Sequence, residues 1–368
     1  MTKPLANRPS ADSFQTLGEI VRAARRRLSQ SDWDFLTGGA DTETTLKRNR
    51  QALDGIALRP RVLRKVDAVD LSCSLLGQRL RMPVVLAPLG SMQQLDPEGA
   101  LPAARAAEAF GTLTILSSAT EPTFEAIKPK IAGPMVYQLY VRGDEAWVRE
   151  HVKRAIDLGY VAFCLTVDTA VYSRRERDIE KRFVPSARQT ASGQSAQAAV
   201  TWDLVKMLRD AFDIPLILKG IATAEDATIA AQHGVNVVYV SNHGGRQLDH
   251  GIGTIDALPE VVKAVAGRAE IMVDGGFVRG TDIVKAVALG AKAVGIGKLL
   301  GWGLAAGGEI GVRRVLELLE TEMQVAMALL GAASIGALDA TCLRPARPVG
   351  APGVTSAFPL LDTAPWNV

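Results

Sequence analysis

The sequence predicts a closed (β/α)8 barrel, and three observations carry that prediction. From Pro83 onward, short apolar runs rich in β-branched residues alternate with helical patterns eight times. These eight units occupy roughly 215 residues, which fits a barrel better than the alternative, a doubly wound open sheet. No G-x-G-x-x-G motif follows the first run, where the chain reads A-P-L-G-S-M. We therefore expect an α/β TIM barrel with an N-terminal helical extension.

Composition narrows the class of protein. The chain has 368 residues, a net charge of +3, 48% hydrophobic and 22% charged residues. This charge is too small to indicate nucleic-acid binding, and no apolar run of about 18 residues predicts a membrane helix. Met1 to Ser10 lack the apolar core of a signal peptide. Three scattered cysteines favour a reducing compartment, so we expect a cytoplasmic protein, and four dispersed histidines predict no metal site.

Residues 1–82 are expected to form the helical extension that caps the barrel. Apolar residues at helical spacing predict a helix over residues 12–30, a short helix over Ser31–Leu36 and a third over Thr44–Leu53. The region that follows, up to Leu80, holds short strands and turns.

The barrel itself is expected over residues 83–345. Its strands are predicted at Val84–Ala87, Leu113–Leu116, Met135–Leu139, Ala162–Val167, Leu216–Leu218, Val237–Val240, Ile271–Val273 and Ala293–Ile296. Its helices are predicted at Pro97–Phe110, Thr123–Ile127, Asp144–Leu158, Trp202–Ala211, Ala224–Gln232, Ala257–Ala266, Gly280–Leu289 and beyond Leu304.

Two segments depart from this alternation. Residues 183–201, after the fourth strand, are rich in Ser, Ala and Gln without a period, so we expect either a mobile lid over the active face or disorder. Residues 346–368 hold several prolines and are expected to wrap the surface, or a neighbouring protomer, as a C-terminal tail.

The most informative stretch follows the sixth strand, V-V-Y-V-S-N-H-G-G-R-Q-L-D from Val237 to Asp249. His243 can exchange a proton near neutral pH, and Arg246 offers a planar fork for a carboxylate or phosphate. Between them, Gly244 and Gly245 allow a positive φ or close approach to a ligand. Because α/β barrels keep their chemistry at the carboxyl ends of strands, this cluster predicts an active site.

The other strand ends divide into two groups. Asp274, Gly275 and Gly276 end the seventh strand, and Gly297 and Lys298 end the eighth, each directly before a helix. This arrangement is typical of a barrel phosphate site.

The remaining ends offer donors for a flat polar heterocycle: Ser117, Gln138, Thr166 and Lys219. Lys219 ends an apolar strand and would be desolvated unless an anion pairs with it. A phosphate-bearing heterocycle that becomes anionic on reduction fits both groups, which indicates FMN. Arg174, Arg175 and Arg177 follow the fourth strand and could join Arg246 in holding a substrate carboxylate.

Several of these motifs together resemble the FMN-dependent 2-hydroxy-acid oxidases and dehydrogenases. They are S-N-H-G-G-R-Q-L-D, L-T-V-D-T, P-L-I-L-K-G, Q-L-Y, L-S-S and D-G-G, in the family's order, over about residues 12 to 340. The resemblance implies oxidation of an L-2-hydroxy acid to a 2-keto acid, with a hydride equivalent passing to flavin N5. It also implies FMN as cofactor and a homotetramer.

The resemblance assigns roles to individual residues. His243 would be the active-site base, with Asp168 steadying its imidazolium. Arg246 and Arg175 would bind the substrate carboxylate, and Tyr140 would hydrogen-bond the substrate. Lys219 would lie by flavin N1 and O2. The flavin ring would lie among Pro88, Leu89, Gly90, Ser117, Gln138, Thr166 and Ser241. The ribose and phosphate would lie among Asp274, Gly275, Gly276, Arg279, Gly297 and Lys298.

Four positions depart from the family's pattern. Phe35 stands where a tyrosine usually touches the substrate carboxylate, and the lost hydrogen bond to a charged group is worth on the order of 1.5–3 kcal/mol. Ala119 replaces a tryptophan of short-chain glycolate oxidases, so the pocket should be wider. Val278 replaces an arginine, with Arg279 one position later, and Lys298 replaces another, which predicts weaker FMN retention.

The sequence therefore predicts an enzyme that oxidises a 2-hydroxy acid larger than glycolate. Two alternatives remain open: a flavoenzyme of the same scaffold acting on a modified peptide or an amine, and a non-catalytic FMN-binding module. Without a haem domain or a membrane segment in the sequence, oxygen or a soluble carrier is the expected electron acceptor, with no nucleic-acid or membrane partner.

Overall fold

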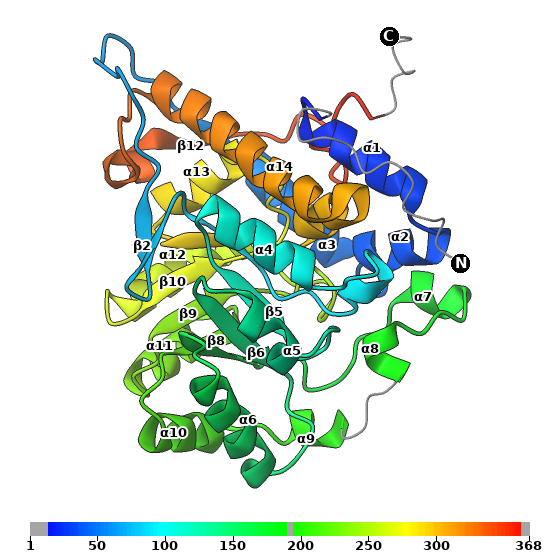
Figure 1. The fold of residues 1–368 in the computed structure, drawn as a ribbon. Coiled ribbons are helices and arrows are strands. Elements are labelled where there is room, and N and C mark those ends of the chain that lie inside the picture. The colour runs from blue at the N-terminus through cyan, green and yellow to red at the C-terminus, as the bar shows by residue number, and fades with distance from the viewer. Residues whose placement is uncertain (1–13, 190–193, 362–368) are drawn as a thin grey trace.

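A closed barrel of eight parallel strands forms the centre of the computed structural model, which describes residues 14–189 and 194–361 (Figure 1). Neighbouring strands follow the order β10-β11-β4-β5-β6-β7-β8-β9 around the barrel. The predicted (β/α)8 fold is confirmed, and the doubly wound open sheet is excluded. The strands are β4 (Val84–Leu86), β5 (Thr114–Ser117), β6 (Met135–Leu139), β7 (Ala162–Thr166), β8 (Leu216–Ile221), β9 (Val237–Val240), β10 (Glu270–Val273) and β11 (Ala293–Ile296).

Strand β8 differs most from its prediction. It continues beyond Leu218 through Lys219 and Gly220 to Ile221, and its register against β9 shifts between Lys219 and Ile221. Gly220 has a φ of +117°, a conformation that side chains other than glycine rarely adopt. Lys219 therefore lies within the strand, next to the bulge, and its side chain is buried.

Helices surround the barrel as the alternation predicts. They are α4 (Leu101–Phe110), α5 (Phe124–Ile127), α6 (Glu145–Asp157), α10 (Trp202–Ala211), α11 (Ala224–Gln232), α12 (Thr254–Val265), α13 (Gly280–Ala288) and α14 (Lys298–Leu330). Helix α14 begins well before the predicted Leu304. It kinks where Gly307 and Gly308 leave helical geometry.

The first and last described parts of the chain pack on the outside of the barrel. Helices α1 (Leu17–Arg27), α2 (Gln30–Thr37) and α3 (Thr44–Asp54) confirm the predicted N-terminal helices, and α1 packs along α14 (Figure 1). Strand β1 (Ile56–Leu58) pairs antiparallel with β12 (Leu343–Pro345). In the C-terminal segment, Phe358 is buried and meets Trp302 edge to face.

A hairpin of β2 (Cys73–Leu75) and β3 (Gln78–Leu80) closes one end of the barrel. Leu75 and Leu80 are buried in one cluster with inward-facing strand residues such as Val136 and Val237. This apolar plug fills the amino-terminal end, so the polar strand ends at the opposite mouth are the ones left to form a site.

The segment after β7 contains more regular structure than the sequence indicates. Helices α7 (Glu176–Glu180), α8 (Ser186–Gln189) and α9 (Gln194–Ala198) lie within or just before the expected lid, while residues 190–193 lie outside the described residues. The Gln197 side chain accepts a hydrogen bond from the Val141 amide at 2.6 Å and donates to the Thr166 carbonyl at 2.9 Å. The described parts of this segment therefore contain helices, and Gln197 ties α9 to the strand ends. The expected role of the segment as a lid stays a prediction.

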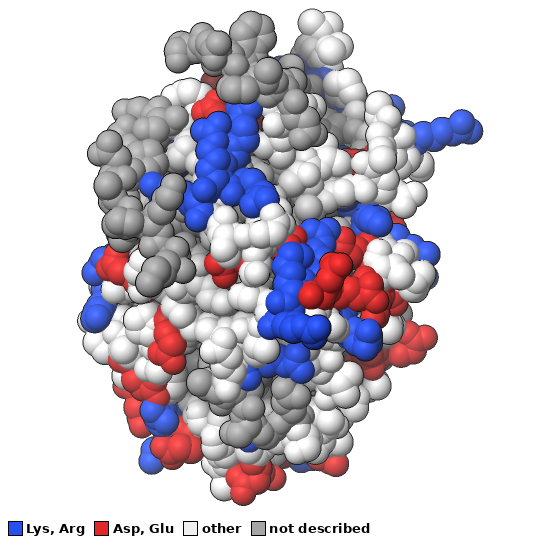
Figure 2. Space-filling view, turned by 90° about the vertical axis from the view of Figure 1, so that its right-hand side faces the viewer, with Lys and Arg blue, Asp and Glu red and all other residues white. Residues whose placement is uncertain are grey.

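The surface carries both charge signs. Figure 2 shows Lys and Arg side chains beside Asp and Glu side chains at several places on one face, in agreement with the small net charge. In the described ranges, no helix combines the length and the apolarity needed to cross a membrane, and no three His, Cys, Asp or Glu side chains are placed to hold a metal ion.

Candidate active site

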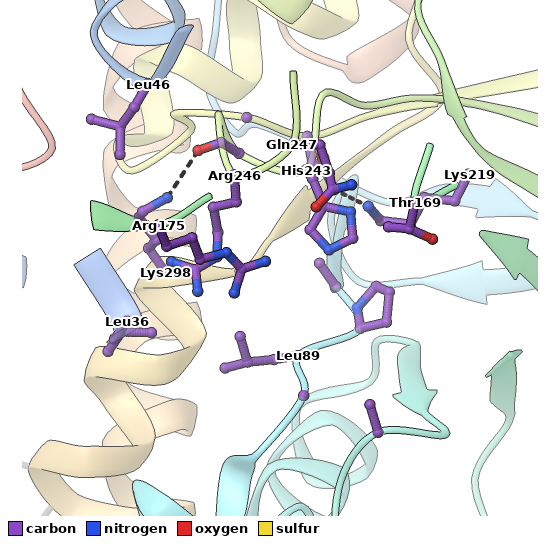
Figure 3. A pocket seen from close by; sticks show the side chains of 18 of the residues that line it. Leu36, Leu46, Leu89, Thr169, Arg175, Lys219, His243, Arg246, Gln247 and Lys298 are labelled. Carbon is purple, nitrogen blue, oxygen red and sulfur yellow. Dashed lines mark hydrogen bonds and ion pairs between the residues drawn. The ribbon is translucent and has the colours of Figure 1, made fainter. Parts of the chain in front are cut away.

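A large cavity opens at the carboxyl ends of the strands, where residues from all parts of the chain meet (Figure 3). Helices α2 and α3 contribute to its wall, together with the loops after β7 and β9. Of the predicted site residues, the cavity is lined by Phe35, Pro88, Leu89, Gly90, Ala119, Tyr140, Arg175, Lys219, His243, Arg246, Asp274, Gly275, Gly276, Gly297 and Lys298. Val278, one of the four positions that depart from the family's pattern, also lines the cavity.

His243 is held by contacts on both ring nitrogens. Its Nδ1 lies 3.2 Å from Asp168 Oδ1, and its Nε2 lies 3.2 Å from the Tyr140 hydroxyl. Its backbone adopts a φ of +59°, and its amide donates to Ser241 Oγ, so the loop conformation aims the ring into the cavity. An ionised carboxylate only accepts, so Nδ1 carries the proton and Nε2 is the free base.

The electrostatics favour this protonation state. Burial lowers the pKa of His243 and outweighs Asp168, which raises it. Burial works against ionisation of Asp168, but the effects of His243 and Lys219 are larger and lower its pKa. Burial raises the pKa of Tyr140 to about 12, so its hydroxyl is a neutral donor to Nε2. Near neutral pH the site therefore holds a neutral imidazole beside a carboxylate.

Lys219 is a charged group in the lining of the cavity. Its Nζ donates to Ser241 Oγ at 2.8 Å and lies 3.3 Å from Asp274 Oδ2. Burial opposes the charge, but Asp274 and Asp168 have the larger effect and raise the lysine pKa well above its usual value. Ser241 in turn donates to Asp274 at 2.6 Å, so this network fixes the ammonium at one place.

Three further cations gather beside His243. Figure 3 shows Arg175, Arg246 and Lys298 reaching the same side of the cavity. Burial and, next in size, the charge of Arg175 lower the pKa of Arg246 to about 9. Burial and the charge of Arg246 lower the pKa of Lys298 to about 7. Arg246 donates to the Gly38 carbonyl and Lys298 to the Gly244 carbonyl, and neither has a carboxylate at ion-pair distance in residues 14–189 and 194–361. Such a cluster is built for anions that enter from outside.

Phe35 and Ala119 shape the apolar part of the cavity. The Arg246 guanidinium lies 5.1 Å from the centre of the buried Phe35 ring, a cation–π contact that keeps the arginine in place without a hydroxyl. Ala119 packs against Gly90, and its methyl group leaves open the volume that a larger side chain would take.

The cavity fits FMN. Gly275 and Gly276 have φ values of +108° and +85°, and nothing lies within 4 Å of the place where a Cβ on Gly297 would stand. These three glycines leave a cradle beside Lys298 where a phosphate can meet the backbone. On the other side, Gln138 Oε1 is buried without a hydrogen-bond partner in the described chain, as expected where a heterocycle would supply a donor.

Four predicted flavin ligands lie in the layer beneath the cavity lining. Gln138 donates to Thr166 Oγ1 at 2.9 Å, Ser117 Oγ accepts from the Ala119 amide, and Ser241 joins Lys219 to Asp274. All four are buried at strand ends. Asp168 likewise supports His243 from behind.

The expectation for Arg279 requires correction. Its guanidinium pairs with Glu322 at 2.6 Å and contacts the Ala357 carbonyl, which draws it away from the cavity toward α14. The backbone here turns into α13, and the side chain after Val278 faces the outer helix layer.

Sequence reasoning missed Arg50 and Asn49, which line the cavity beside Gly276. Arg50 is 4% exposed and forms a bidentate pair with Asp282 at 2.7 and 2.8 Å, while its NH1 reaches the Gly276 carbonyl at 3.3 Å. The signal was an arginine on the apolar face of the predicted third helix.

Replacing Asp282 with alanine is expected to lower the free energy of unfolding by about 3–5 kcal/mol, because Arg50 would remain buried without its main partner. Chemical denaturation measures the change. Asp54→Ala is the matched control: Asp54 also pairs with Arg50 but is 36% exposed, so its loss should cost about 1 kcal/mol or less. Equal effects of the two variants would contradict this account.

Comparison with known proteins places the chain in a family. The family model of FMN-dependent dehydrogenases matches residues 24–345. This chain belongs to that family. It is therefore an oxidoreductase, and FMN is its cofactor, in agreement with the cavity's cradle.

Relatives of this chain have been named for several substrates. The chain is 40% identical over 354 residues to an L-lactate oxidase of Nostoc sp., covering 89% of this chain and 97% of that one. It is 39% identical over 341 residues to glycolate oxidase of Spinacia oleracea, covering 87% and 92%. A crystal structure of mandelate oxidase with benzoyl-formic acid has a TM-score of 0.85 and 40% identity, covering 92% of this chain and 100% of that chain.

Proposed function

We propose that the protein oxidises an L-2-hydroxy acid larger than glycolate to the corresponding 2-keto acid. The observation that carries this proposal is the neutral His243 imidazole beside Arg246 and Arg175, two guanidinium groups without a carboxylate at ion-pair distance in the described residues. A base next to an anion receptor suits a substrate whose reacting carbon is bonded to a carboxylate.

Each residue then has a defined task. Arg246 and Arg175 hold the substrate carboxylate. On substrate binding, the Tyr140 hydroxyl exchanges its hydrogen bond with Nε2 for one to the substrate, which leaves Nε2 free to accept. His243 accepts the hydroxyl proton at Nε2, and Asp168 stabilises the imidazolium that forms. FMN, when bound, supplies the two-electron acceptor, taking the hydride equivalent at N5. Lys219 offers a fixed positive charge where negative charge develops.

Ala119 is the feature that supports a substrate larger than glycolate. Its small side chain leaves the cavity open above Gly90. Mandelate oxidase, the structural relative described above, acts on an acid with an aromatic ring, which is consistent with a roomy pocket.

The visible spectrum tests this proposal directly. Anaerobic addition of 2-hydroxy acids from glycolate and lactate to mandelate should bleach the bound flavin, with larger acids reacting faster than glycolate. In Ala119→Trp, bleaching by mandelate should fall at least tenfold while bleaching by glycolate is retained. A wild-type protein that prefers glycolate would contradict the size assignment, and a flavin that no 2-hydroxy acid bleaches would contradict the reaction.

Phe35 favours a second candidate, a modified peptide or an amine as substrate. A carboxylate receptor would gain from the hydroxyl that Phe35 lacks. The presence of both Arg246 and Arg175 weighs against this candidate, and bleaching by an amine but by no hydroxy acid would establish it. Complete absence of flavin reduction would instead support a binding module.

Oxygen is the proposed electron acceptor, because the relatives named above are oxidases; a soluble carrier is the alternative. A homotetramer and a cytoplasmic location remain predictions.

We expect FMN affinity to fall as the pH rises. Lys298 is the cation beside the glycine cradle, and burial followed by Arg246 lowers its pKa to about 7. A bound phosphate favours the protonated form, so above pH 7 binding must take up a proton and weakens by up to tenfold per pH unit. Fluorescence titration of apoprotein with FMN between pH 7.5 and 9 measures this. In Lys298→Arg the charge persists, so the affinity should be flat; an equal slope in both proteins would contradict the role.

A further inference from the structure

Tyr172 lies in the loop after β7 and lines the cavity that holds His243. This loop is tied to the histidine loop: Gln247 donates to the carbonyls of Asp168 and Val171 at 3.0 and 2.9 Å, and Ser173 donates to the Arg246 carbonyl. The tyrosine is therefore positioned by the same backbone that positions the base and its arginine.

The hydroxyl of Tyr172 is buried, yet it has no hydrogen-bond partner among the residues that the structure describes. A buried hydroxyl left unpaired costs about 1–3 kcal/mol. Such a group in a ligand cavity indicates that a bound molecule supplies the missing partner.

Two arginines locate this hydroxyl relative to the substrate site. The Arg175 guanidinium carbon lies 4.3 Å from the centre of the Tyr172 ring. Arg246 lines the same cavity, and Ser173, the residue after Tyr172, donates a hydrogen bond to the Arg246 carbonyl. Tyr172 thus belongs to the same anion receptor as Arg175 and Arg246.

The aromatic ring next to Arg246 lacks a hydroxyl. Phe35 packs under Arg246 with its ring centre 5.1 Å from the guanidinium carbon, and it has no polar atom to offer. The receptor therefore has two guanidinium groups, each on an aromatic ring, and only the ring of Tyr172 carries a donor.

We propose that Tyr172 is a substrate-binding residue whose hydroxyl donates a hydrogen bond to the substrate carboxylate, the contact that Phe35 cannot make. This inference rests on the proposed function, since it assumes a carboxylate on Arg175 and Arg246. Arg188 of α8 also contacts the Tyr172 ring, 4.0 Å from its centre, so the ring position is set from the lid segment as well.

Tyr172→Phe isolates the hydroxyl, because the phenylalanine ring keeps the cation–π contact with Arg175. Oxalate is a suitable probe: it carries carboxylates, is not a 2-hydroxy acid, and its binding to the FMN-loaded protein can be followed by the change in the flavin spectrum. We expect Tyr172→Phe to weaken oxalate binding about 10- to 100-fold, the value of a hydrogen bond to a charged group. The affinity for FMN should not change.

Two further variants test whether a hydroxyl at position 35 can replace the hydroxyl of Tyr172. Phe35→Tyr restores a donor on the other ring, so the loss caused by Tyr172→Phe should shrink severalfold in that background. Tyr172→Leu removes the ring as well and should weaken oxalate more than Tyr172→Phe.

The outcomes separate this inference from the proposed function. If Tyr172→Phe binds oxalate as tightly as the unchanged protein, the inference is overturned, whatever the enzyme oxidises. If no 2-hydroxy acid reduces the flavin but oxalate binding still depends on the hydroxyl, the receptor assignment stands and only the reaction falls. With a 2-hydroxy acid that does react, a rise in KM without a matching fall in kcat is the expected signature.

Discussion

Replacing His243 with alanine should slow flavin reduction by the substrate about 10²- to 10⁴-fold, the usual contribution of a positioned general base. Asp168 lies 3.2 Å from Nδ1 and orients the ring, so the neutral Nε2 is placed next to the arginine pair to accept the hydroxyl proton. FMN should stay bound, because the cofactor cradle is made by the glycines of other strand ends. Anaerobic stopped-flow mixing measures the rate, and the visible spectrum measures the FMN content.

His250 provides the matched control. It lies seven positions further along the same loop, is exposed, and is absent from the cavity lining. His250→Ala should therefore reduce its flavin at nearly the original rate. Unchanged reduction in His243→Ala would remove the histidine from the mechanism.

The same base sets a pH dependence. Burial lowers the pKa of His243 below its ordinary value of 6.5, so the neutral form persists at lower pH than for an exposed histidine. Protonation on the acid side removes the base. The rate of flavin reduction should therefore be level on the alkaline side and decline only at a pH lower than the one at which an exposed histidine would become protonated.

The second large effect is expected at Arg246. Removing one partner of a buried, hydrogen-bonded charge pair costs about 2–5 kcal/mol, so Arg246→Leu should lower kcat/KM by about 30-fold to several thousandfold. Arg246→Lys keeps a charge but loses the planar fork, and should recover only part of the loss. Steady-state kinetics with the best 2-hydroxy acid measures both.

Arg174 is the control for this prediction. It is adjacent to Arg175 in sequence, but it is 70% exposed and lies 3.6 Å from Asp41. Arg174→Leu should leave kcat/KM within about twofold, as for most exposed ion pairs. A comparable loss in Arg174→Leu and Arg246→Leu would mean that overall positive charge attracts the substrate, not a specific receptor.

The sequence by itself determined the barrel and the core of the candidate site. Parallel strands that are buried on both faces must be apolar, so the sequence shows them as eight apolar runs. A polar residue at the end of such a run is easily recognised as a candidate site residue. His243, Arg246 and Lys219 were found for that reason. The position of the FMN cradle followed from the glycines after the last two strands, which connect directly to helices.

The positions of other site residues depend on the direction of their side chains in loops and helices, which the strand pattern does not determine. Arg279 follows Val278 by one position, yet it turns to Glu322 on α14 and leaves the cavity. Arg50 reaches the cavity because Asp282, far away in the sequence, holds its guanidinium. Tyr172 belongs to the receptor because a loop without a regular repeat is bound to the histidine loop through Gln247. Sequence periodicity fixes direction only within strands and helices; in loops and at helix ends, direction is decided by partners that only the tertiary structure brings together.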